Sequence, residues 1–215
     1  RYWPEYGAHG KEAVTVRDAL SHRTGTPQMP AGATPDSICD WDATCAGLAA
    51  LEPIFPVGEP AYQAVSFGWV IGEIVRRTDP EGRSFRDFVQ QEICAPYGID
   101  DLWIGIPDEV EPRIARLIDD LGQKAPPPGT ALEKAMPFEI RLAPDVFELP
   151  QVRRATLAGV GGIFTARSLA RFYAILANGG TLDGKRLLSA ERVEMCCHLR
   201  PGGTLPDPVF FGMPM

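Results

Sequence analysis

A turn rich in proline and glycine runs into the clearest amphipathic helix of the chain between Pro56 and Thr78. Five apolar side chains recur there at three- and four-residue steps: Phe67, Val70, Ile71, Ile74 and Val75. This spacing predicts that they share one buried helical face, and Asp79-Pro80 predicts where the helix ends. Tyr62 follows the turn at the entrance to the helix, where a rigid element would hold a phenol that can face a cleft.

Length and charge narrow the class of protein. The 215 residues are 45% hydrophobic, enough for one domain, or one and a half, with a substantial core. The net charge of -7 and the pI of about 5.0 disfavour a nucleic-acid surface. No apolar run reaches the roughly 18 residues of a membrane span. The composition therefore favours a globular protein without a membrane span.

Neither a metal site nor a cofactor site is predicted. The histidines are His9, His22 and His198, which are too far apart for ligand spacing. The segment Gly159-Val-Gly-Gly162 is too short for a dinucleotide or phosphate loop, although such a turn can still bring backbone close to a ligand. Five irregularly spaced cysteines predict free thiols in a reducing compartment, with the cytoplasm favoured: Cys39, Cys45, Cys94, Cys196 and Cys197.

The rest of the chain indicates short helices joined by long irregular connections. Helices are expected over residues 14–20, 40–51, 84–93, 165–178 and 189–196, and a hairpin is expected around Asp183-Gly184. Residues 1–6 are expected to lie on the surface. Residues 107–153 are expected to form an extended excursion, with helix possible from Glu111 to Leu121. The inward face of the 165–178 helix is predicted to carry Leu169, Phe172, Tyr173 and Leu176.

No serine in the chain has the surroundings of an activated nucleophile. Ser66, in Ala64-Val-Ser66-Phe-Gly68, matches part of a nucleophile-elbow motif. The preceding prolines cannot form the buried strand that an elbow needs, so a packing or polar role is favoured for Ser66. No serine is followed by lysine three positions later, and Arg171, which follows Ser168 at that spacing, cannot act as a base.

Three sequence blocks carry a family resemblance. Val14–Gly25 resembles the T-V-R-x-L-L-S-H-x-S-G segment of the class C-like branch of the serine β-lactamase and penicillin-binding-protein superfamily. The block from Pro56 to Ile74 is similar to its P-G-x-x-x-x-Y-S-N-x-x-Y-G-L-L-G-x-I segment, and the block from Ala158 to Phe172 to its A-G-G-L-x-S-T-A-x-D-L-A-R-F segment. Tyr62-Gln-Ala64, with Trp69 after Phe-Gly, looks most like the family VIII esterases, which are carboxylesterases built on the β-lactamase fold.

The resemblance implies a β-lactamase/transpeptidase-like fold, which is α+β in the whole protein. Residues 1–205 would form its mainly α-helical domain with short hairpins, and residues 206–215 would begin the return to an α/β domain. The family's Ser-x-x-Lys would precede this chain, and its third motif would follow it. The chain thus resembles one half of a two-domain hydrolase, whose partner is the missing remainder of its own chain.

The resemblance also implies a chemistry. In the family, a serine attacks the substrate while a lysine and a tyrosine move its proton, and of these residues only Tyr62 carries over. Ala64 replaces the Asn with which β-lactamases hold an amide side chain, which favours a short acyl ester cleaved through an acyl-enzyme. The 215 residues alone are expected to be inactive. A β-lactamase, a D-amino-acid peptidase, an acyltransferase and a non-catalytic ligand-binding member remain alternatives, so the substrate would be a small ester or amide.

Overall fold

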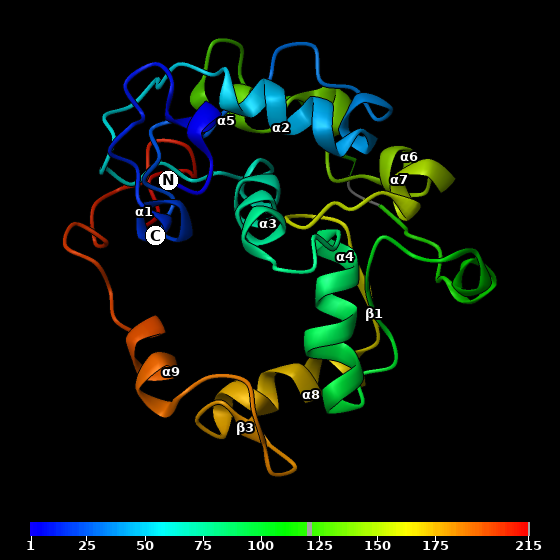
Figure 1. Ribbon diagram of the computed structural model, residues 1–215. Helices are drawn as coiled ribbons and strands as arrows, with labels where there is room; N and C mark the ends of the chain where they lie inside the picture. Colours follow the sequence, from blue (N-terminus) through cyan, green and yellow to red (C-terminus); the bar gives the residue numbers. More distant parts are fainter. Residues whose placement is uncertain (120–121, 215) are drawn as a thin grey trace.

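The computed structural model describes residues 1–119 and 122–214 and is mainly helical (Figure 1). The α-helices are α1 (Val16–Leu20), α2 (Trp41–Ala49), α3 (Phe67–Thr78), α4 (Phe85–Phe88), α5 (Ala131–Ala135), α6 (Pro144–Phe147), α7 (Pro150–Arg154), α8 (Ala166–Ala177) and α9 (Ala190–Cys196). The 3-10 turns are η1 (Pro4–Gly7), η2 (Ser37–Cys39), η4 (Ala95–Tyr97), η5 (Asp108–Arg113) and η6 (Phe138–Ile140), and η3 (Val89–Cys94) is a π-helix. The strands are β1 (Leu102–Ile104), β2 (Gly162–Phe164), β3 (Thr181–Leu182) and β4 (Lys185–Arg186).

Local capping explains why the predicted helices form where they do. The hydroxyl of Thr15 accepts the N–H of Asp18, and the Asp18 carboxylate accepts the N–H of Thr15, which completes a capping box at α1. At four other predicted helices a side chain accepts a backbone N–H of the first turn, without the reciprocal bond: Asp40 caps α2, Ser84 caps α4, Thr165 caps α8 and Ser189 caps α9. The predicted hairpin is also confirmed, with β3 and β4 antiparallel on either side of Asp183-Gly184.

Helix α3 is the centre of the main core, but its most buried residues differ from those predicted. Trp69, Val70 and Glu73 are buried, whereas most of the predicted apolar face is only half-buried. Glu73 tolerates burial because its carboxylate accepts hydrogen bonds from Trp41, Arg76 and Arg77. The helical period was therefore predicted correctly, but the buried face is rotated because a paired carboxylate can occupy a core position.

The N-terminal segment lies at the surface as predicted, since Arg1, Tyr2, Pro4 and Glu5 are exposed, but two of its aromatic side chains anchor it to the core. Trp3 and Tyr6 are buried in the main core, and the Tyr6 hydroxyl is hydrogen-bonded to Thr26 Oγ1 at 3.0 Å. Buried Lys11 follows this segment and donates to the carbonyls of Ala49 and Leu51 at the C-terminal end of α2. A cation suits this position because the last carbonyls of a helix have no partner within the helix.

A second apolar cluster joins η3 to α8. Helix α4 continues directly into η3, which confirms a helical segment over most of residues 84–93. Ile175 of α8 is fully buried against this cluster, and strands β1 and β2 pair antiparallel beside it. The prediction that Tyr173 points inward is wrong, since Tyr173 is 57% exposed. The sequence pattern left Ile175 out, although it provides the deepest contact of α8.

The excursion over residues 107–153 is built from short turns of helix. The predicted helix from Glu111 to Leu121 is absent from the described part of that range, because the 3-10 turn η5 ends at Arg113 and residues 114–119 are not helical. The Leu117 N–H donates to Glu148 Oε1 at 2.7 Å instead of to a carbonyl four residues earlier, so a contact with a distant side chain takes the place of a helical hydrogen bond. Residues 120 and 121 lie outside the described residues.

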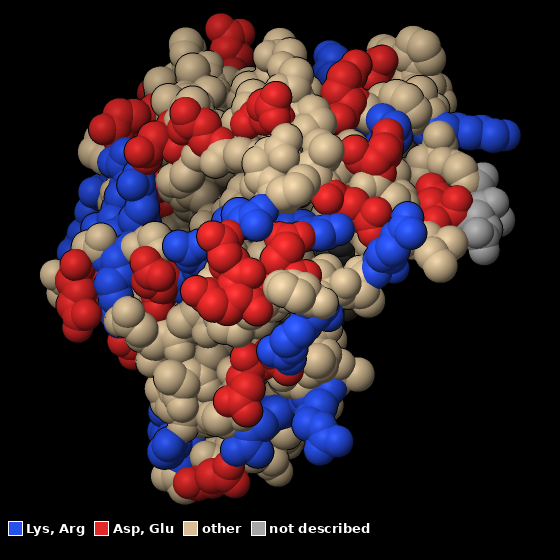
Figure 2. Space-filling view, turned by 90° about the vertical axis from the view of Figure 1, so that its right-hand side faces the viewer, with Lys and Arg blue, Asp and Glu red and all other residues tan. Residues whose placement is uncertain are grey.

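The C-terminal segment returns to the N-terminal part of the molecule, where both ends of the chain lie near α1 (Figure 1). Arg23 donates to the Pro201 carbonyl at 2.7 Å, and Arg200 pairs with Asp18 at 2.7 Å. Figure 2 shows basic and acidic side chains interspersed over one face, without a continuous basic patch on it. Within the described residues, no helix is both long and apolar enough to cross a bilayer.

Candidate active site

Two of the three sequence blocks meet just before α3. His22, at the end of the first block, has a left-handed backbone with φ of 55°. Its Nδ1 accepts the N–H of Gln63 at 3.2 Å, and its ring centroid lies 4.8 Å from that of Tyr62 and 4.6 Å from that of Phe67. The imidazole therefore contacts three residues: Tyr62, Gln63 and Phe67, the first residue of α3.

The third block reaches the same helix through two glycines. A Cβ atom on Gly68 would lie 2.0 Å from the backbone nitrogen of Gly159, and one on Gly159 would lie 3.0 Å from the carbonyl oxygen of Val65. The backbones of the two blocks are thus in direct contact, which a side chain at either position would disturb. The glycine-rich turn therefore packs its backbone against the start of α3.

Tyr62 is half-buried and lies five residues before the first residue of α3. Its backbone N–H donates to Asp207 Oδ2 at 2.9 Å, and its ring lies 5.0 Å from that of Phe210. Within residues 1–119 and 122–214 its hydroxyl makes no hydrogen bond, and that oxygen is not buried. The structure therefore holds the ring and backbone of Tyr62, while its phenol oxygen has no hydrogen-bond partner among the described residues.

Asp207 is a structural residue of this site that sequence reasoning missed. It is buried; Oδ1 accepts the N–H groups of Val209 and Phe210 at 2.8 Å, while Oδ2 accepts that of Tyr62. The Pro206-Asp207-Pro208 sequence is a signal for such an Asx turn. The sequence did not predict that Asp207 would accept a hydrogen bond from Tyr62, because the two residues lie 145 positions apart.

His22 is held in a neutral form by its surroundings. Burial lowers its pKa, and the nearby charge of Asp207 partly opposes that effect. Since Nδ1 accepts a hydrogen bond from Gln63, that nitrogen carries no proton and the ring proton is on Nε2. Protonation of Nδ1 would replace an accepted hydrogen bond with two facing donors, so charge on His22 would loosen the backbone that follows Tyr62.

Two polar neighbours of Tyr62 are enclosed. Ser66 is fully buried, and its hydroxyl donates to the Pro27 carbonyl at 3.3 Å, which confirms the polar packing role and excludes an exposed elbow serine. The Gln63 side chain is 1% exposed, and neither its amide oxygen nor its amide nitrogen has a partner within the described residues. Ser66 and Gln63 are thus enclosed, whereas the phenol oxygen of Tyr62 is not fully buried.

A mainly helical unit with short hairpins, and with a tyrosine beside a histidine and a glycine-rich turn, has the architecture of the helical part of β-lactamase-like proteins. The beta-lactamase family model matches residues 1–213, so the chain belongs to that family. The resemblance and the β-lactamase/transpeptidase-like fold predicted from the three blocks are confirmed.

Relatives with esterase and penicillin-binding-protein names are similar to this chain. It is 33% identical over 204 residues to the esterase/beta-lactamase LipL of Mycobacterium tuberculosis, a match that covers 89% of this chain. A penicillin-binding protein homologue from Caulobacter crescentus has a TM-score of 0.81 at 37% identity over 100% of the chain. A family VIII carboxylesterase has a TM-score of 0.84 at 30% identity over 98% of the chain.

The chain spans about half the length of these relatives. It covers 47% of LipL and 55% of each of the two solved structures. The family and the fold of the described part are therefore established.

Proposed function

We propose that the full-length protein that carries this chain is a serine hydrolase, a carboxylesterase that cleaves short acyl esters through an acyl-enzyme. The observation that carries the proposal is the position of Tyr62: its phenol oxygen has no partner among the described residues, and the block that contains it contacts both of the other family blocks. The names of the relatives support the same chemistry, since they include an esterase/beta-lactamase and a family VIII carboxylesterase.

The proposed reaction has two halves. A serine outside this chain attacks the ester carbonyl, and its proton passes to the Tyr62 phenolate as the new ester bond forms. Tyr62 then gives that proton to the departing alcohol as the original ester bond breaks. Water next attacks the acyl-serine, releasing the carboxylic acid and restoring the serine hydroxyl. A phenol with an ordinary pKa near 10 can play this role only beside a cation that stabilises its phenolate, which the family's lysine would supply.

Ala64 supports an ester over a lactam as the substrate. The position two residues after Tyr62 corresponds to the family Asn that holds an amide side chain, and a methyl group there can neither donate nor accept a hydrogen bond. The preference for a short acyl group remains part of the proposal, as does the Tyr62 relay.

The proposal is tested with the full-length protein, p-nitrophenyl acetate and the lactam nitrocefin. We expect turnover of the ester, together with a covalent acetyl adduct on a serine, detected by intact-protein mass spectrometry after rapid acid quench. Nitrocefin hydrolysis that exceeds ester hydrolysis would favour the β-lactamase alternative, and the absence of both reactions would contradict the hydrolase assignment.

A further inference from the structure

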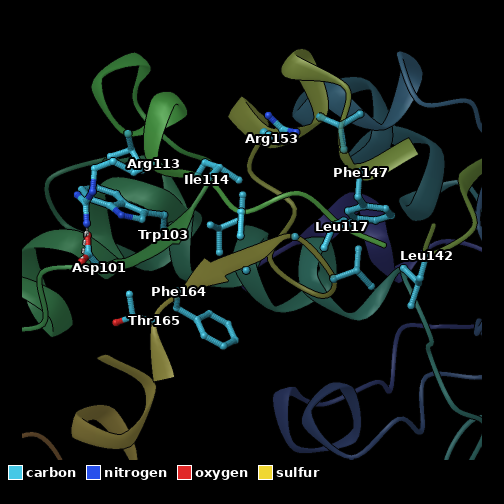
Figure 3. Close-up of a pocket in the computed structure, with 17 residues that line it drawn as sticks. Asp101, Trp103, Arg113, Ile114, Leu117, Leu142, Phe147, Arg153, Phe164 and Thr165 are labelled. Carbon is cyan, nitrogen blue, oxygen red and sulfur yellow. Dashed lines mark hydrogen bonds and ion pairs between the residues drawn. The ribbon is translucent and has the colours of Figure 1, made fainter. Parts of the chain in front are cut away.

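The cavity beside the β1–β2 pair lies apart from Tyr62. Its volume is about 510 Å³, and Trp103 and Arg113 stand at one end of it while Phe147 and Leu142 stand at the other (Figure 3). Among the described residues, its lining includes neither Tyr62 nor a residue that forms a hydrogen bond or a ring contact with Tyr62. The contacts that set the position of the phenol therefore come from other parts of the chain.

Three consecutive backbone N–H groups around Tyr62 are held by two distant residues. The Ala61 N–H donates to the His22 carbonyl at 2.8 Å, and the Gln63 N–H donates to His22 Nδ1 at 3.2 Å. The Tyr62 N–H between them donates to Asp207 Oδ2 at 2.9 Å. The segment is neither helix nor strand, so it has no regular hydrogen-bond pattern of its own, and His22 and Asp207 together fix its backbone.

The carboxylate of Asp207 is itself fixed in place. Asp207 is 1% exposed, and its other oxygen, Oδ1, accepts the N–H groups of Val209 and Phe210 at 2.8 Å. Its backbone N–H donates to the Met213 carbonyl at 3.1 Å. A buried carboxylate bonded in this way resists displacement, because each N–H that it left would lose its acceptor.

The turn from Asp207 to Phe210 also contacts the ring of Tyr62. The Phe210 ring lies 5.0 Å from the Tyr62 ring, and Val209 is buried in one apolar cluster with Ala61, the residue before Tyr62. Because the phenol oxygen is at the far end of the side chain, a small rotation of the backbone moves it through a larger distance. A displacement of about 1 Å can lower the rate of a catalysed step about a hundredfold.

We propose that Asp207 is a positioning residue of the esterase. Its carboxylate holds the Tyr62 N–H and the turn that it closes holds the Tyr62 ring, so that the phenol oxygen lies where the proton transfer requires it. Since Asp207 is buried, it acts through Tyr62 and not on the substrate. This role rests on the proposed function, because it matters for catalysis only if Tyr62 moves a proton.

Asp207→Asn separates the two tasks of the carboxylate. The amide oxygen can still accept the N–H groups of Val209 and Phe210, as asparagine does in such turns, but the amide NH2 then faces the Tyr62 N–H as a second donor. In the full-length protein we expect kcat for p-nitrophenyl acetate to fall about tenfold while KM changes by less than about twofold, since the lost contact affects proton transfer and not the binding of the ester.

A double-mutant cycle distinguishes positioning from general support of the fold. In a Tyr62→Phe background no phenol remains to be placed, so Asp207→Asn should lower the residual kcat by less than about twofold. An equal loss of kcat in both backgrounds would overturn the proposal, as would a kcat of Asp207→Asn within about twofold of the parent protein.

Phe210→Leu tests the same turn while leaving the carboxylate in place, which covers the case in which Asp207→Asn folds poorly. We expect it to lower kcat about threefold in the parent protein and not in the Tyr62→Phe background, and an equal loss in both would overturn the role of the turn. Asp40→Asn is the matched control, because it also neutralises a carboxylate that accepts a backbone N–H, and asparagine keeps the cap of α2. It should leave kcat unchanged.

Amide hydrogen exchange separates the positioning role from the proposed function. Exchange at the Tyr62 amide, resolved by mass spectrometry with fragmentation, should be at least about tenfold faster in Asp207→Asn, because that N–H has lost its acceptor. Faster exchange together with an unchanged kcat for Tyr62→Phe would confirm the contact but refute the Tyr62 relay, and with it the catalytic role of Asp207. Unchanged exchange in a protein whose kcat depends on Tyr62 would overturn the positioning role and leave the proposed function standing.

Discussion

The Nδ1 atom of His22 accepts a hydrogen bond from the backbone N–H of Gln63 at 3.2 Å, across 41 positions of the chain. This contact joins the turn after α1 to the segment that carries Tyr62, and the same imidazole lies against the Tyr62 ring. It follows that the geometry around the proposed catalytic phenol depends on a histidine that must stay neutral.

The stability of the protein should therefore depend on pH through His22. Its pKa is lowered by burial, so the unfolded chain binds more protons than the folded one. The contribution is fully present above the unfolded pKa of about 6.5 and is lost as pH falls through the lower folded value. His22→Asn keeps an acceptor that does not titrate and suits a left-handed backbone. We expect it to flatten the decline in the free energy of unfolding between pH 7 and pH 5, measured in urea.

His9 offers a matched control for this experiment. It also has a left-handed backbone, with φ of 58°, but its side chain is exposed. His9→Asn should leave the pH dependence of stability as it is in the parent protein. Equal flattening in both variants would show that the His22–Gln63 contact is not the source of the effect.

Close packing between Gly68 and Gly159 predicts a large effect of a single methyl group. In Gly68→Ala the added Cβ would overlap the Gly159 nitrogen, so α3 and the glycine-rich turn must separate. Overpacking of this kind costs about 2–3 kcal/mol, and ester turnover should fall with it because the segment that carries Tyr62 leads into α3. Gly7→Ala places its Cβ 3.6 Å from the nearest atom and should change the free energy of unfolding by less than about 0.5 kcal/mol. Similar denaturation midpoints for the two variants would contradict the packing account.

The buried carboxylate of Glu73 should stabilise the main core. Burial alone would raise its pKa, but hydrogen bonds from Arg76, Trp41 and Arg77 outweigh burial and hold the pKa below its usual value. Glu73→Leu leaves the Trp41 N–H without a partner and removes the buried partner of both arginines, which keep only exposed carboxylates, so we expect a loss of about 2–3 kcal/mol in urea unfolding. Asp42→Asn removes an exposed partner of Arg76 and should cost less than about 1 kcal/mol. A Glu73→Leu protein as stable as Asp42→Asn would mean that the carboxylate network contributes little.

The isolated 215-residue chain should not react with a fluorophosphonate probe. Ser66, the one serine with part of a nucleophile motif, is fully buried and donates to a carbonyl, and no serine of the chain has lysine three positions later. The full-length protein should take up one equivalent of probe, counted by intact-protein mass spectrometry. Stoichiometric labelling of the isolated chain would place the nucleophile within these residues and refute the proposed division of the site.

Features set by neighbouring residues were predictable from the sequence. The capping box of Thr15 and Asp18 and the Asp183-Gly184 hairpin depend on residues a few positions apart, and both formed as expected. The helix expected within residues 111–121 is absent from its described part, where the Leu117 N–H bonds to the distant Glu148 side chain, a contact that no local pattern predicts. Tyr173 was placed inward because helical spacing gives a face but not the element that covers it.

Contacts between distant parts of the chain could not be predicted from local sequence patterns. The pairing of β1 with β2 and the hydrogen bond from Tyr62 to Asp207 join residues with no shared local signal. Tyr62 was singled out through the family resemblance, and its catalytic role is still a prediction. The neighbours that hold it, His22 and Asp207, emerged only when the segments were brought together in three dimensions.

The most direct test of the account is the turnover number of Tyr62→Phe in the full-length protein with p-nitrophenyl acetate. Phenylalanine keeps the ring contacts with His22 and Phe210 and the backbone bond to Asp207, and removes only the phenol oxygen. We expect kcat to fall by about a hundredfold or more with an unchanged melting temperature, as removal of a proton-transfer group does. A kcat within about twofold of the parent would contradict the central claim that this phenol moves the proton.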